Sequence, residues 1–508
     1  MKRSVDEPNS YSHIVKYTGL FGGVQGLNIL IGIVRNKLVA TILGPSGMGL
    51  ISLFNSTINL VSNSTNLGIQ MSAVRNISEI YDSGDKAEIG HVVKLIRSWS
   101  LLTALAGMLL CIVLSPLLSY WTFGWGNHTL HFIFLSPVIG LMAIAGGEMA
   151  ILKGTRHLKR LAVISIYNML AALFTSIPIY YFFGESGIVP SLIVMALFQM
   201  IFAISYSYRL FPLKISFNNG LLGEGFSIVR LGIAFVAAGI LGSGAEYVIR
   251  SYLSFSSSLE TVGLFTAGYM MTMTYSGLVF SAMETDYFPR LSAIHNNIKE
   301  ANLLVNRQME VSLLLIAPIL VFFTISLPIL IPLLYTGKFV PVMGMMQVMV
   351  LAMYMRAIKL PLAYMPLSKG DSATYLILES IYDVIIVLFV IFAFNKWGLT
   401  GCGIAITAAG LVDFFLVLFY VRFKYHYRCS QEIKRYMAIQ LPIGILAYLF
   451  TFIENGFVYW FAGGLLTMAS AGISYELLRK KSSLLPSALK KFRRKKDDNI
   501  QSIDIDDV

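Results

Sequence analysis

Charged residues are scarce in this 508-residue chain: they make up 13% of the sequence, whereas hydrophobic residues make up 56%. Soluble domains contain about 25% charged and about 45–50% apolar residues. The mean hydropathy is +0.70, and a helix needs about 20 predominantly apolar residues to cross a bilayer. The composition therefore excludes a water-soluble enzyme and predicts a polytopic membrane protein.

Cysteine and metal-ligating clusters are also sparse. The three cysteines are scattered in or beside apolar stretches, so they cannot form a disulfide framework or a CxxC metal site. His128 and His131 have no further ligand nearby in the sequence, and no Walker A motif occurs. We therefore expect no metal, no cofactor and no P-loop ATP hydrolysis. The polar start Met1–Ser12 lacks the features of a cleavable signal peptide.

Long apolar runs, separated by turn residues and charge clusters, predict an all-α fold with about fourteen membrane spans. The second span is unusually polar and the last two are short. The spans are expected near residues 13–35, 46–72, 92–117, 131–152, 161–183, 187–208, 227–250, 260–284, 308–333, 341–365, 373–395, 401–421, 435–453 and 457–478.

Positive charge is unevenly distributed over the predicted loops. Most of the 39 Lys and Arg residues fall on the side that carries both termini, which the positive-inside rule assigns to the cytoplasm. The tail Arg479–Lys496 is basic with interleaved Leu and Phe, and acidic residues follow it. We expect this tail to contact anionic lipid. We expect no nucleic-acid partner, because the chain has no folded nucleic-acid reader.

The first twelve predicted spans contain an internal repeat. The segment at 34–54 matches the segment at 249–269, which pairs Arg35 with Arg250, and later matches pair Arg75 with Arg290 and Lys153 with Lys369. Six spans per repeat predict two bundles with the same membrane orientation, related by a pseudo-two-fold axis along the membrane normal, as in rocking-bundle transporters. The predicted divisions are a six-helix bundle at 1–215, a second one at 216–425, two additional helices at 426–480 and a cytoplasmic tail at 481–508.

Carboxamide side chains form stripes on the first two predicted spans. On a helix with 100° per residue, each stripe falls on one face. Such a stripe cannot face lipid without unsatisfied hydrogen-bonding groups. It either makes hydrogen bonds between helices or lines a polar cavity, where carboxamides suit sugar hydroxyls because they both donate and accept. The candidate sugar-binding residues are Gln25, Asn28, Asn55, Asn59, Asn63, Asn66 and Gln70.

Basic residues also fall within or near the spans. Arg35 and Arg250 occupy equivalent places near the outer ends of spans one and seven, and Arg356 and Lys359 share a face of span ten. Intramembrane charges are costly, so they usually face a cavity or a partner, and Arg binds phosphate bidentately. These residues, with Lys37, favour an anionic headgroup in a central cavity. The alternatives are snorkelling to the outer interface for Arg35, Lys37 and Arg250, and an early helix end for Arg356 and Lys359.

The candidate intramembrane acids are Glu148, Glu246, Asp383 and Asp413. Each is a candidate proton- or sodium-coupling site, or an ion-pair partner for a basic residue. Glu246 and Arg250 have the i,i+4 spacing at which helical side chains can satisfy each other.

Several segments resemble one transporter family. The stretch LVATILGPSGMGLISLFN at 38–55, followed by LGIQMSAVRNISE, is similar to the start of bacterial lipid-linked oligosaccharide flippases. These form the polysaccharide-transport branch of the multidrug/oligosaccharidyl-lipid/polysaccharide (MOP) superfamily, and the O-antigen and enterobacterial common antigen translocases are the relatives that it resembles. VIRSYLS, VGLFTAGY, DYFPRLSAI and LLYTGKF, between residues 248 and 339, fit the same family. The resemblance covers about the twelve-span core.

This resemblance implies a V-shaped pair of bundles that works by alternating access in the bacterial cytoplasmic membrane. It implies an undecaprenyl-pyrophosphate-linked oligosaccharide as the substrate, moved to the periplasmic leaflet, so the basic residues above would hold the pyrophosphate. A polysaccharide polymerase and a chain-length regulator are the expected partners. A cation-coupled drug exporter of the same superfamily is the alternative. We expect no enzymatic activity, because a glycan polymerase or glycosyltransferase would need a large outer loop with paired carboxylates or basic clusters.

Overall fold

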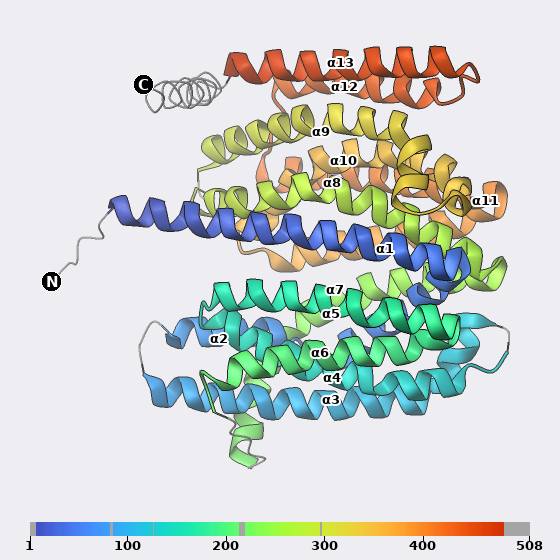
Figure 1. Cartoon of the computed structure of the whole chain (residues 1–508). Helices are drawn as coiled ribbons and strands as arrows, with labels where there is room; N and C mark the ends of the chain where they lie inside the picture. The colour runs from blue at the N-terminus through green and yellow to red at the C-terminus, as the bar shows by residue number, and fades with distance from the viewer. Residues whose placement is uncertain (1–6, 82–84, 125, 213–218, 295–296, 482–508) are drawn as a thin grey trace, which may run out of the picture. The chain divides into compact units, whose positions relative to one another are not determined.

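The computed structural model describes residues 7–81, 85–124, 126–212, 219–294 and 297–481, and it is helical with no strand in these ranges (Figure 1). The predicted all-α class is confirmed. The helices, with η for 3₁₀, are α1 (Glu7–Thr65), α2 (Ile69–Tyr81), α3 (Lys86–Phe123), α4 (Thr129–Gly154), α5 (Leu158–Phe183), η1 (Gly184–Gly187), α6 (Ile188–Tyr208), α7 (Asn219–Ser256), α8 (Leu259–Ala293), α9 (Ile298–Leu334), η2 (Gly337–Val342), α10 (Met343–Ser368), α11 (Ser372–Tyr425), α12 (Gln431–Phe450) and α13 (Gly456–Lys481).

Many of these helices are long and apolar enough to cross a membrane. Eight helical stretches within the described ranges meet this requirement, among them Ala87–Phe123, Thr129–Gly154 and Ile298–Leu334. Some stretches contain more than one helix: Lys159–Tyr208 includes both α5 and α6. The chain therefore has several apolar spans, and the total of fourteen crossings stays a prediction.

Glycines break two of the longest helices. A continuous helix of 59 residues would be about 90 Å long at 1.5 Å per residue, far longer than a bilayer is thick. Gly44 in α1 has φ 67° and ψ −170°, outside the helical region, and Pro45 starts the next helix. Gly398, with φ 57°, breaks α11 in the same way. Both breaks fall between spans that the sequence predicts as separate.

The chain packs into two compact units, which we describe separately. Unit 1 comprises Met1–Ala267, Leu330–Val342 and Glu379–Asn395, and unit 2 comprises Gly268–Ile329, Met343–Leu378 and Lys396–Val508. The limits of these units cut through α8, α9 and α11. They do not test the predicted domain boundaries at residues 215 and 425, which stay predictions.

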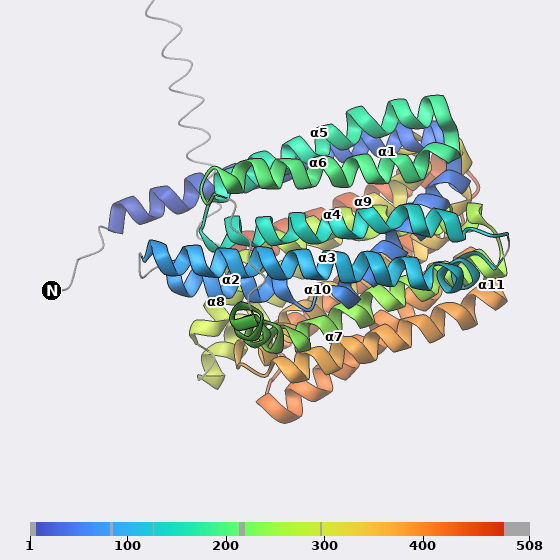
Figure 2. The same cartoon turned by 90° about the horizontal axis from the view of Figure 1, so that it is seen from below.

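Within unit 1, α4 lies alongside α3 and α6, as both views show (Figures 1 and 2). The short helix α2 packs against α4, and Ile69, Ala73 and Ile77 of α2 share a buried apolar cluster with Ile151 of α4. Gly154 permits this approach, because a Cβ there would lie 2.6 Å from the Cβ of Ile77. The packing fixes α2 against the end of α4 that carries Lys153.

The helices α1 and α8 cross backbone to backbone inside unit 1. A Cβ on Gly49 would collide with the carbonyl oxygen of Leu259, and a Cβ on Gly263 would collide with that of Pro45. Next to this crossing, the hydroxyls of Ser52 and Thr266, which are 214 residues apart, are hydrogen-bonded at 2.7 Å. The contact is thus reciprocal between the two stretches that the repeat pairs, while the pseudo-two-fold symmetry of the core stays a prediction.

Unit 2 holds the last two helices by specific contacts. Gly444 of α12 faces the ring of Tyr354 on α10, where a Cβ would lie 2.7 Å from the ring. The hydroxyl of Tyr459 on α13 donates to the carbonyl of Ile325 on α9 at 2.7 Å. The side chain of Gln440, fully buried on α12, donates to the hydroxyl of Ser474 on α13 at 3.0 Å. The α12–α13 pair is therefore packed against α9 and α10.

Candidate functional site

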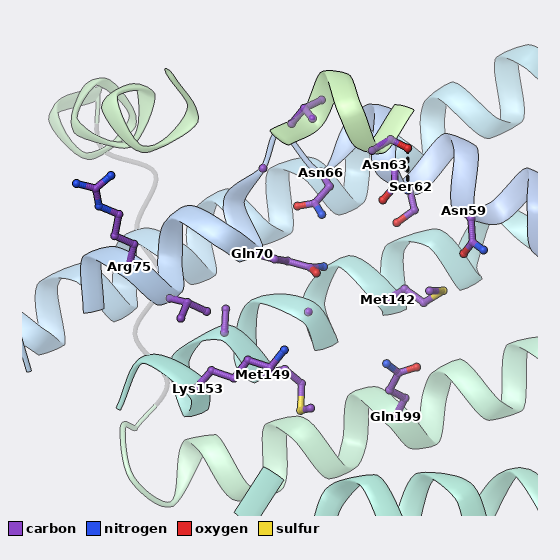
Figure 3. A pocket seen from close by; sticks show the side chains of 16 residues that line it. Asn59, Ser62, Asn63, Asn66, Gln70, Arg75, Met142, Met149, Lys153 and Gln199 are labelled. Atoms are coloured by element: carbon purple, nitrogen blue, oxygen red, sulfur yellow. Dashed lines mark hydrogen bonds between the residues drawn. The ribbon is translucent and has the colours of Figure 1, made fainter. Parts of the chain in front are cut away.

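Unit 1 contains a cavity of about 720 Å³ with a polar wall (Figure 3). This volume is within the usual range of about 300–1,000 Å³ for small-molecule sites. The lining comes from five helices and the turn between α1 and α2: Asn59, Ser62 and Asn63 of α1, Asn66 and Gly68 of the turn, Gln70, Val74 and Arg75 of α2, Met142, Gly146, Met149, Ala150 and Lys153 of α4, Gln199 of α6, and Val236 and Gly239 of α7.

Helical periodicity explains why these residues meet. Asn59 and Asn63 are four residues apart and so share one face of α1, and Asn66 follows directly after the end of this helix. Leu67 and Gly68, both with positive φ, form a turn that ends α1 and sets α2 at a new angle. On α4, the residues 142, 146, 149 and 153 also follow helical spacing. The two faces enclose the cavity, with α6 and α7 completing it.

A glycine on α4 makes room for a carboxamide. A Cβ on Gly146 would collide with Nε2 of Gln70, so this side chain lies across α4 only because position 146 has none. Figure 3 shows Gln70 reaching from α2 between the two walls. The side chain of Gln70 therefore occupies the middle of the cavity.

Most of the cavity's carboxamides retain their hydrogen-bonding capacity. Asn63 Nδ2 donates weakly to the carbonyl of Gly239 at 3.4 Å. The side chains of Asn59, Asn66, Gln70 and Gln199 make no hydrogen bond to other residues in the described part of the chain. Each has two donors and an acceptor for a ligand, a donor and acceptor pattern that suits sugar hydroxyl and acetamido groups.

Positive charge lies at one end of the cavity. Lys153 is in the last turn of α4 and is exposed, and no side chain among the described residues pairs with it. Arg75 of α2 is exposed and forms an ion pair with Glu79 at 2.9 Å. Figure 3 shows Arg75 and Lys153 at the opposite end from Asn59 and Gln199. The described lining contains no carboxylate.

The structure brings four of the predicted sugar-binding residues together in this cavity: Asn59, Asn63, Asn66 and Gln70. Asn55 is exposed on α1 and is outside the lining. Asn28 is buried, and its Nδ2 donates to Ser165 Oγ of α5 at 2.7 Å, which is a bond between helices. The side chain of Gln25 lies outside the described residues.

The predicted basic residues of unit 1 make contacts elsewhere, outside the described lining of this cavity. Arg35 Nε donates to Ser176 Oγ at 3.2 Å, and Lys37 Nζ donates to the carbonyl of Pro332 at 2.6 Å. Arg250 is buried; its guanidinium pairs with Glu246 at 3.0 Å and donates to Ser52 Oγ at 2.8 Å. The i,i+4 pair considered for Glu246 and Arg250 is thus present.

The two predicted bases of unit 2 differ in their surroundings. Lys359 is buried and pairs with Asp413 at 3.0 Å. Arg356 is exposed; its Nη1 lies 3.3 Å from the sulfur of Met273, and its guanidinium lies 5.7 Å from the ring centre of Phe280. A shared cationic cavity made by Arg35, Arg250, Arg356 and Lys359 stays a prediction.

The remaining predicted acids also have neighbours. Glu148 pairs with Arg97, and Asp383 of α11 is half-buried and faces Gly242 of α7, where a Cβ would lie 3.7 Å from its carboxylate. Of the four acids, Glu148, Glu246 and Asp413 are therefore in ion pairs. Whether any of the four couples transport to an ion stays a prediction.

Sequence reasoning assigned no role in the site to Lys153, Arg75, Gln199 or Arg97. In the sequence, Lys153 and Arg75 are distinguished only by their place in the matched repeat segments. Gln199 is an isolated carboxamide within an apolar run, which is the signal that could have identified it. Arg97 lies inside the span predicted at 92–117, and this position could have suggested a partner on a neighbouring helix.

Comparisons with known proteins agree with this architecture. The chain is similar to solved transporter structures. One is lipid II flippase MurJ in an inward closed conformation, which matches with a TM-score of 0.71, 16% identity and coverage of 91% of this chain and 99% of that one. An inward-facing multidrug resistance MATE family transporter of the MOP superfamily matches with a TM-score of 0.65, 15% identity and coverage of 80% and 96%. These structural matches show the fold, which is that of the MOP superfamily transporters.

A third solved structure has the same fold. It is a MOP superfamily transporter from Pyrococcus furiosus whose binding pocket is described as having reverse polarity, and it matches with a TM-score of 0.53, 14% identity and coverage of 81% and 94%. No curated protein sequence matches the chain significantly. The family model described as "Polysaccharide biosynthesis protein" matches residues 38–344, more than half of the chain. The chain belongs to this polysaccharide biosynthesis family.

Proposed function

We propose that the protein is a flippase for a lipid-linked oligosaccharide. It moves an undecaprenyl-pyrophosphate-linked glycan from the cytoplasmic to the periplasmic leaflet of the bacterial inner membrane, in the synthesis of a surface polysaccharide such as O-antigen. The observation that carries this proposal is the carboxamide-lined cavity of unit 1, with basic residues at one end, in a member of the polysaccharide biosynthesis family. The lipid II flippase MurJ, which has the same fold, supports it.

The physical problem of such a substrate explains the cavity. A pyrophosphate and several sugars cannot cross hydrocarbon unaided, because each unsatisfied polar group costs several kcal/mol. Asn59, Asn66, Gln70 and Gln199 offer hydrogen bonds that replace those of water. The polyprenyl tail stays in the lipid while the head group is carried by alternating access. Both termini lie in the cytoplasm in this orientation, and a polymerase and a chain-length regulator act on the product.

A cation-coupled drug exporter is the second candidate, and the likeness to a MATE transporter favours it. Organic cations bind best where carboxylates and aromatic rings line a cavity. The described lining of the unit 1 cavity has two basic residues, Arg75 and Lys153, and no carboxylate. The charge of this cavity therefore supports the oligosaccharide substrate over a cationic drug.

A reconstituted leaflet assay tests the proposal. Purified protein in proteoliposomes receives a fluorescent polyprenyl-pyrophosphate-linked oligosaccharide, and a membrane-impermeant glycosidase reports how much sugar faces outward over time. We expect the protein to accelerate exchange between leaflets, and the double variant Asn66→Leu, Gln70→Leu to reduce the rate at least tenfold. Asn36→Leu, a half-buried carboxamide of α1 outside the cavity, is the matched control and should keep the rate.

Two results would contradict the proposal. Equal exchange in protein-free and protein-containing liposomes would exclude flippase activity on this substrate. Export of ethidium or another organic cation from the same proteoliposomes, without lipid exchange, would favour the drug exporter.

A further inference from the structure

Lys153, at the basic end of the unit 1 cavity, differs from the buried bases Arg250, Lys359 and Arg97 because it has no carboxylate partner among the described residues. Arg250 is paired with Glu246, Lys359 with Asp413, and Arg97 with Glu148, all at 2.8–3.0 Å. Lys153, by contrast, is exposed on the cavity and has no carboxylate within ion-pair distance among the described residues. Its ammonium group has three donors available for an anionic ligand.

The second base strengthens the positive charge at the same end. Arg75 lines the cavity from α2. Among the described residues its guanidinium donates to Glu79 through Nε alone, in a pair whose side chains are 65% and 60% exposed. Such an exposed pair is weak and exchanges readily with another anion. Because α2 is packed against α4 through Ile77 and Gly154, the two bases lie on helices held at a fixed spacing.

The other end of the cavity has a different chemistry. From Lys153 to Met142 the lining of α4 extends over eleven residue steps, or about 16 Å along the helix. Over this length the polar groups are neutral: Gln70 in the middle, then Asn59 and Gln199 at the far end (Figure 3). Arg75 and Lys153 are the charged residues of the described lining, which contains no acid and no further base.

From this polarity we infer how the substrate lies. Lys153, assisted by Arg75, binds the diphosphate, and the sugars nearest the diphosphate extend toward Asn59 and Gln199. This inference rests on the proposed flippase function and deepens it. It also specifies the glycan: the sugars next to the diphosphate are neutral or acetamido sugars, because a uronic acid or an amino sugar would bring a charge to a wall that has no counter-charge.

A binding experiment with inorganic pyrophosphate tests the first part. The full-length protein is placed in nanodiscs of phosphatidylcholine, and pyrophosphate binding is measured by calorimetry. A hydrogen bond to a charged group contributes enough that its loss weakens binding by roughly tenfold to a hundredfold, so we expect this loss in Lys153→Ala and a smaller loss in Lys153→Arg. Arg209→Ala removes an equal charge from the exposed end of α6, outside the cavity, and should bind as the wild type does.

Further arms distinguish the sources of the phosphate. Nanodiscs that contain phosphatidylglycerol test whether an ordinary anionic lipid occupies the site at Lys153. No loss of pyrophosphate affinity with this lipid, or an equal loss in wild type and Lys153→Ala, agrees with a diphosphate site. A loss in the wild type alone shows that the lipid competes for Lys153, and it overturns the inference. If Lys153→Ala does not fold, as judged by its melting curve, Lys153→Gln replaces it. Wild-type pyrophosphate affinity in the folded variant overturns the inference.

The leaflet assay separates this inference from the proposed function. If the wild type flips the lipid-linked glycan and Lys153→Ala flips it equally fast, the flippase function stands and the role of Lys153 is excluded. If the wild type binds pyrophosphate through Lys153 but moves no lipid-linked glycan, the proposed function fails. For the glycan, substrates that differ only in the first sugar are compared; equal or faster transport with a uronic acid there contradicts the neutral wall.

Discussion

Arg97 of α3 and Glu148 of α4 form a buried two-pronged ion pair, with Nε–Oε1 at 2.8 Å and Nη2–Oε2 at 3.1 Å. Both side chains are at most 3% exposed. The same guanidinium donates to the carbonyl of Pro212 at 3.0 Å and to Ser207 Oγ of α6 at 3.3 Å. One side chain thus connects α3, α4 and α6, and two of these helices line the cavity.

Breaking this pair should destabilise the protein strongly. Removal of one partner leaves a buried charge uncompensated, which costs about 3–5 kcal/mol, so Arg97→Met and Glu148→Leu should each lower the melting temperature in detergent. The double variant should be more stable than either single one, because no unpaired charge remains. Lys480→Met, which breaks an exposed pair with Glu476, is the control and should change little. Single variants with the wild-type melting temperature would contradict this prediction.

The crossing of α1 and α8 should not tolerate a methyl group. Gly49→Ala and Gly263→Ala each place a Cβ against a backbone carbonyl of the facing helix, and such overpacking costs about 1–3 kcal/mol. Thermal unfolding in detergent measures the loss. Gly26→Ala, in α1 but with no atom within 4 Å of its Cβ, should be neutral or stabilising because Ala favours helix. Equal melting temperatures for Gly49→Ala and Gly26→Ala would show that the crossing is not tight.

A large side chain at Gly146 should block transport rather than folding. The atom in its way is the flexible end of Gln70, which can move into the cavity. We expect Gly146→Leu to reduce the flipping rate at least tenfold at an unchanged amount of membrane protein, as measured in proteoliposomes. Gly464→Leu, on α13 with nothing within 4 Å, is the control. An unreduced rate for Gly146→Leu would exclude this cavity from the substrate's path.

Arg356 of unit 2 and Arg35 of unit 1 test the predicted role of the intramembrane bases. Its charge is exposed, and its described neighbours are a sulfur and an aromatic ring. We expect Arg356→Ala, and likewise Arg35→Ala, to reduce surface glycan assembly in cells without loss of the protein from the membrane. Quantitative gels of the surface polysaccharide measure the effect. Wild-type glycan in both variants would remove these arginines from the mechanism.

Acid should weaken the hydrogen bonds that Asp371, the residue before α11, makes with Lys424 and Tyr425. Asp371, outside the helix, accepts hydrogen bonds from Lys424, Tyr425 and the backbone of Thr374. The Lys424 bond, followed by those of Tyr425 and Thr374, holds the pKa of Asp371 well below its usual value of 3.8. This stabilisation is therefore complete above about pH 4 and is lost as the pH falls further toward the lowered pKa.

Melting temperatures of wild type and Asp371→Asn as a function of pH check this. The difference should be constant between pH 5 and 7, and it should shrink as the pH falls below about 4. Glu79→Gln, which removes an exposed carboxylate, serves as the control. A difference that grows in acid would have the wrong sign and would falsify the assignment.

Sequence reasoning located the helices well because their signals are local. Apolar runs predicted the spans, and the Gly–Pro pair at 44–45 and Gly398 mark the places where the structure breaks α1 and α11. Part of the carboxamide stripe was also readable, because a period of 3.6 places Asn59 and Asn63 on one face of α1 whatever the helix packs against, with Asn66 just after its end.

Contacts between helices were not readable in the same way. A single sequence does not say which face of α3 meets which face of α4, so the Arg97–Glu148 pair and the Lys359–Asp413 pair depend on packing that only the structure shows. The surroundings of each base also depend on packing: Arg250 is buried and paired with Glu246, whereas Lys153 is exposed and lines the cavity. In the sequence alone, Arg250 and Lys153 are both simply basic residues, and nothing there distinguishes their surroundings.

The short connection between α11 and α12 has a consequence for the last two helices. Asn306 of α9 receives hydrogen bonds from Tyr427 and the amide of Ser430 on its Oδ1, and its Nδ2 donates to the carbonyl of Arg428. A chain ending after α11 would strip these partners from a side chain that is 6% exposed. A truncated protein designed to keep only the helices up to α11 should therefore retain at least residues 426–430, because these residues bind Asn306 of α9 before α12 begins.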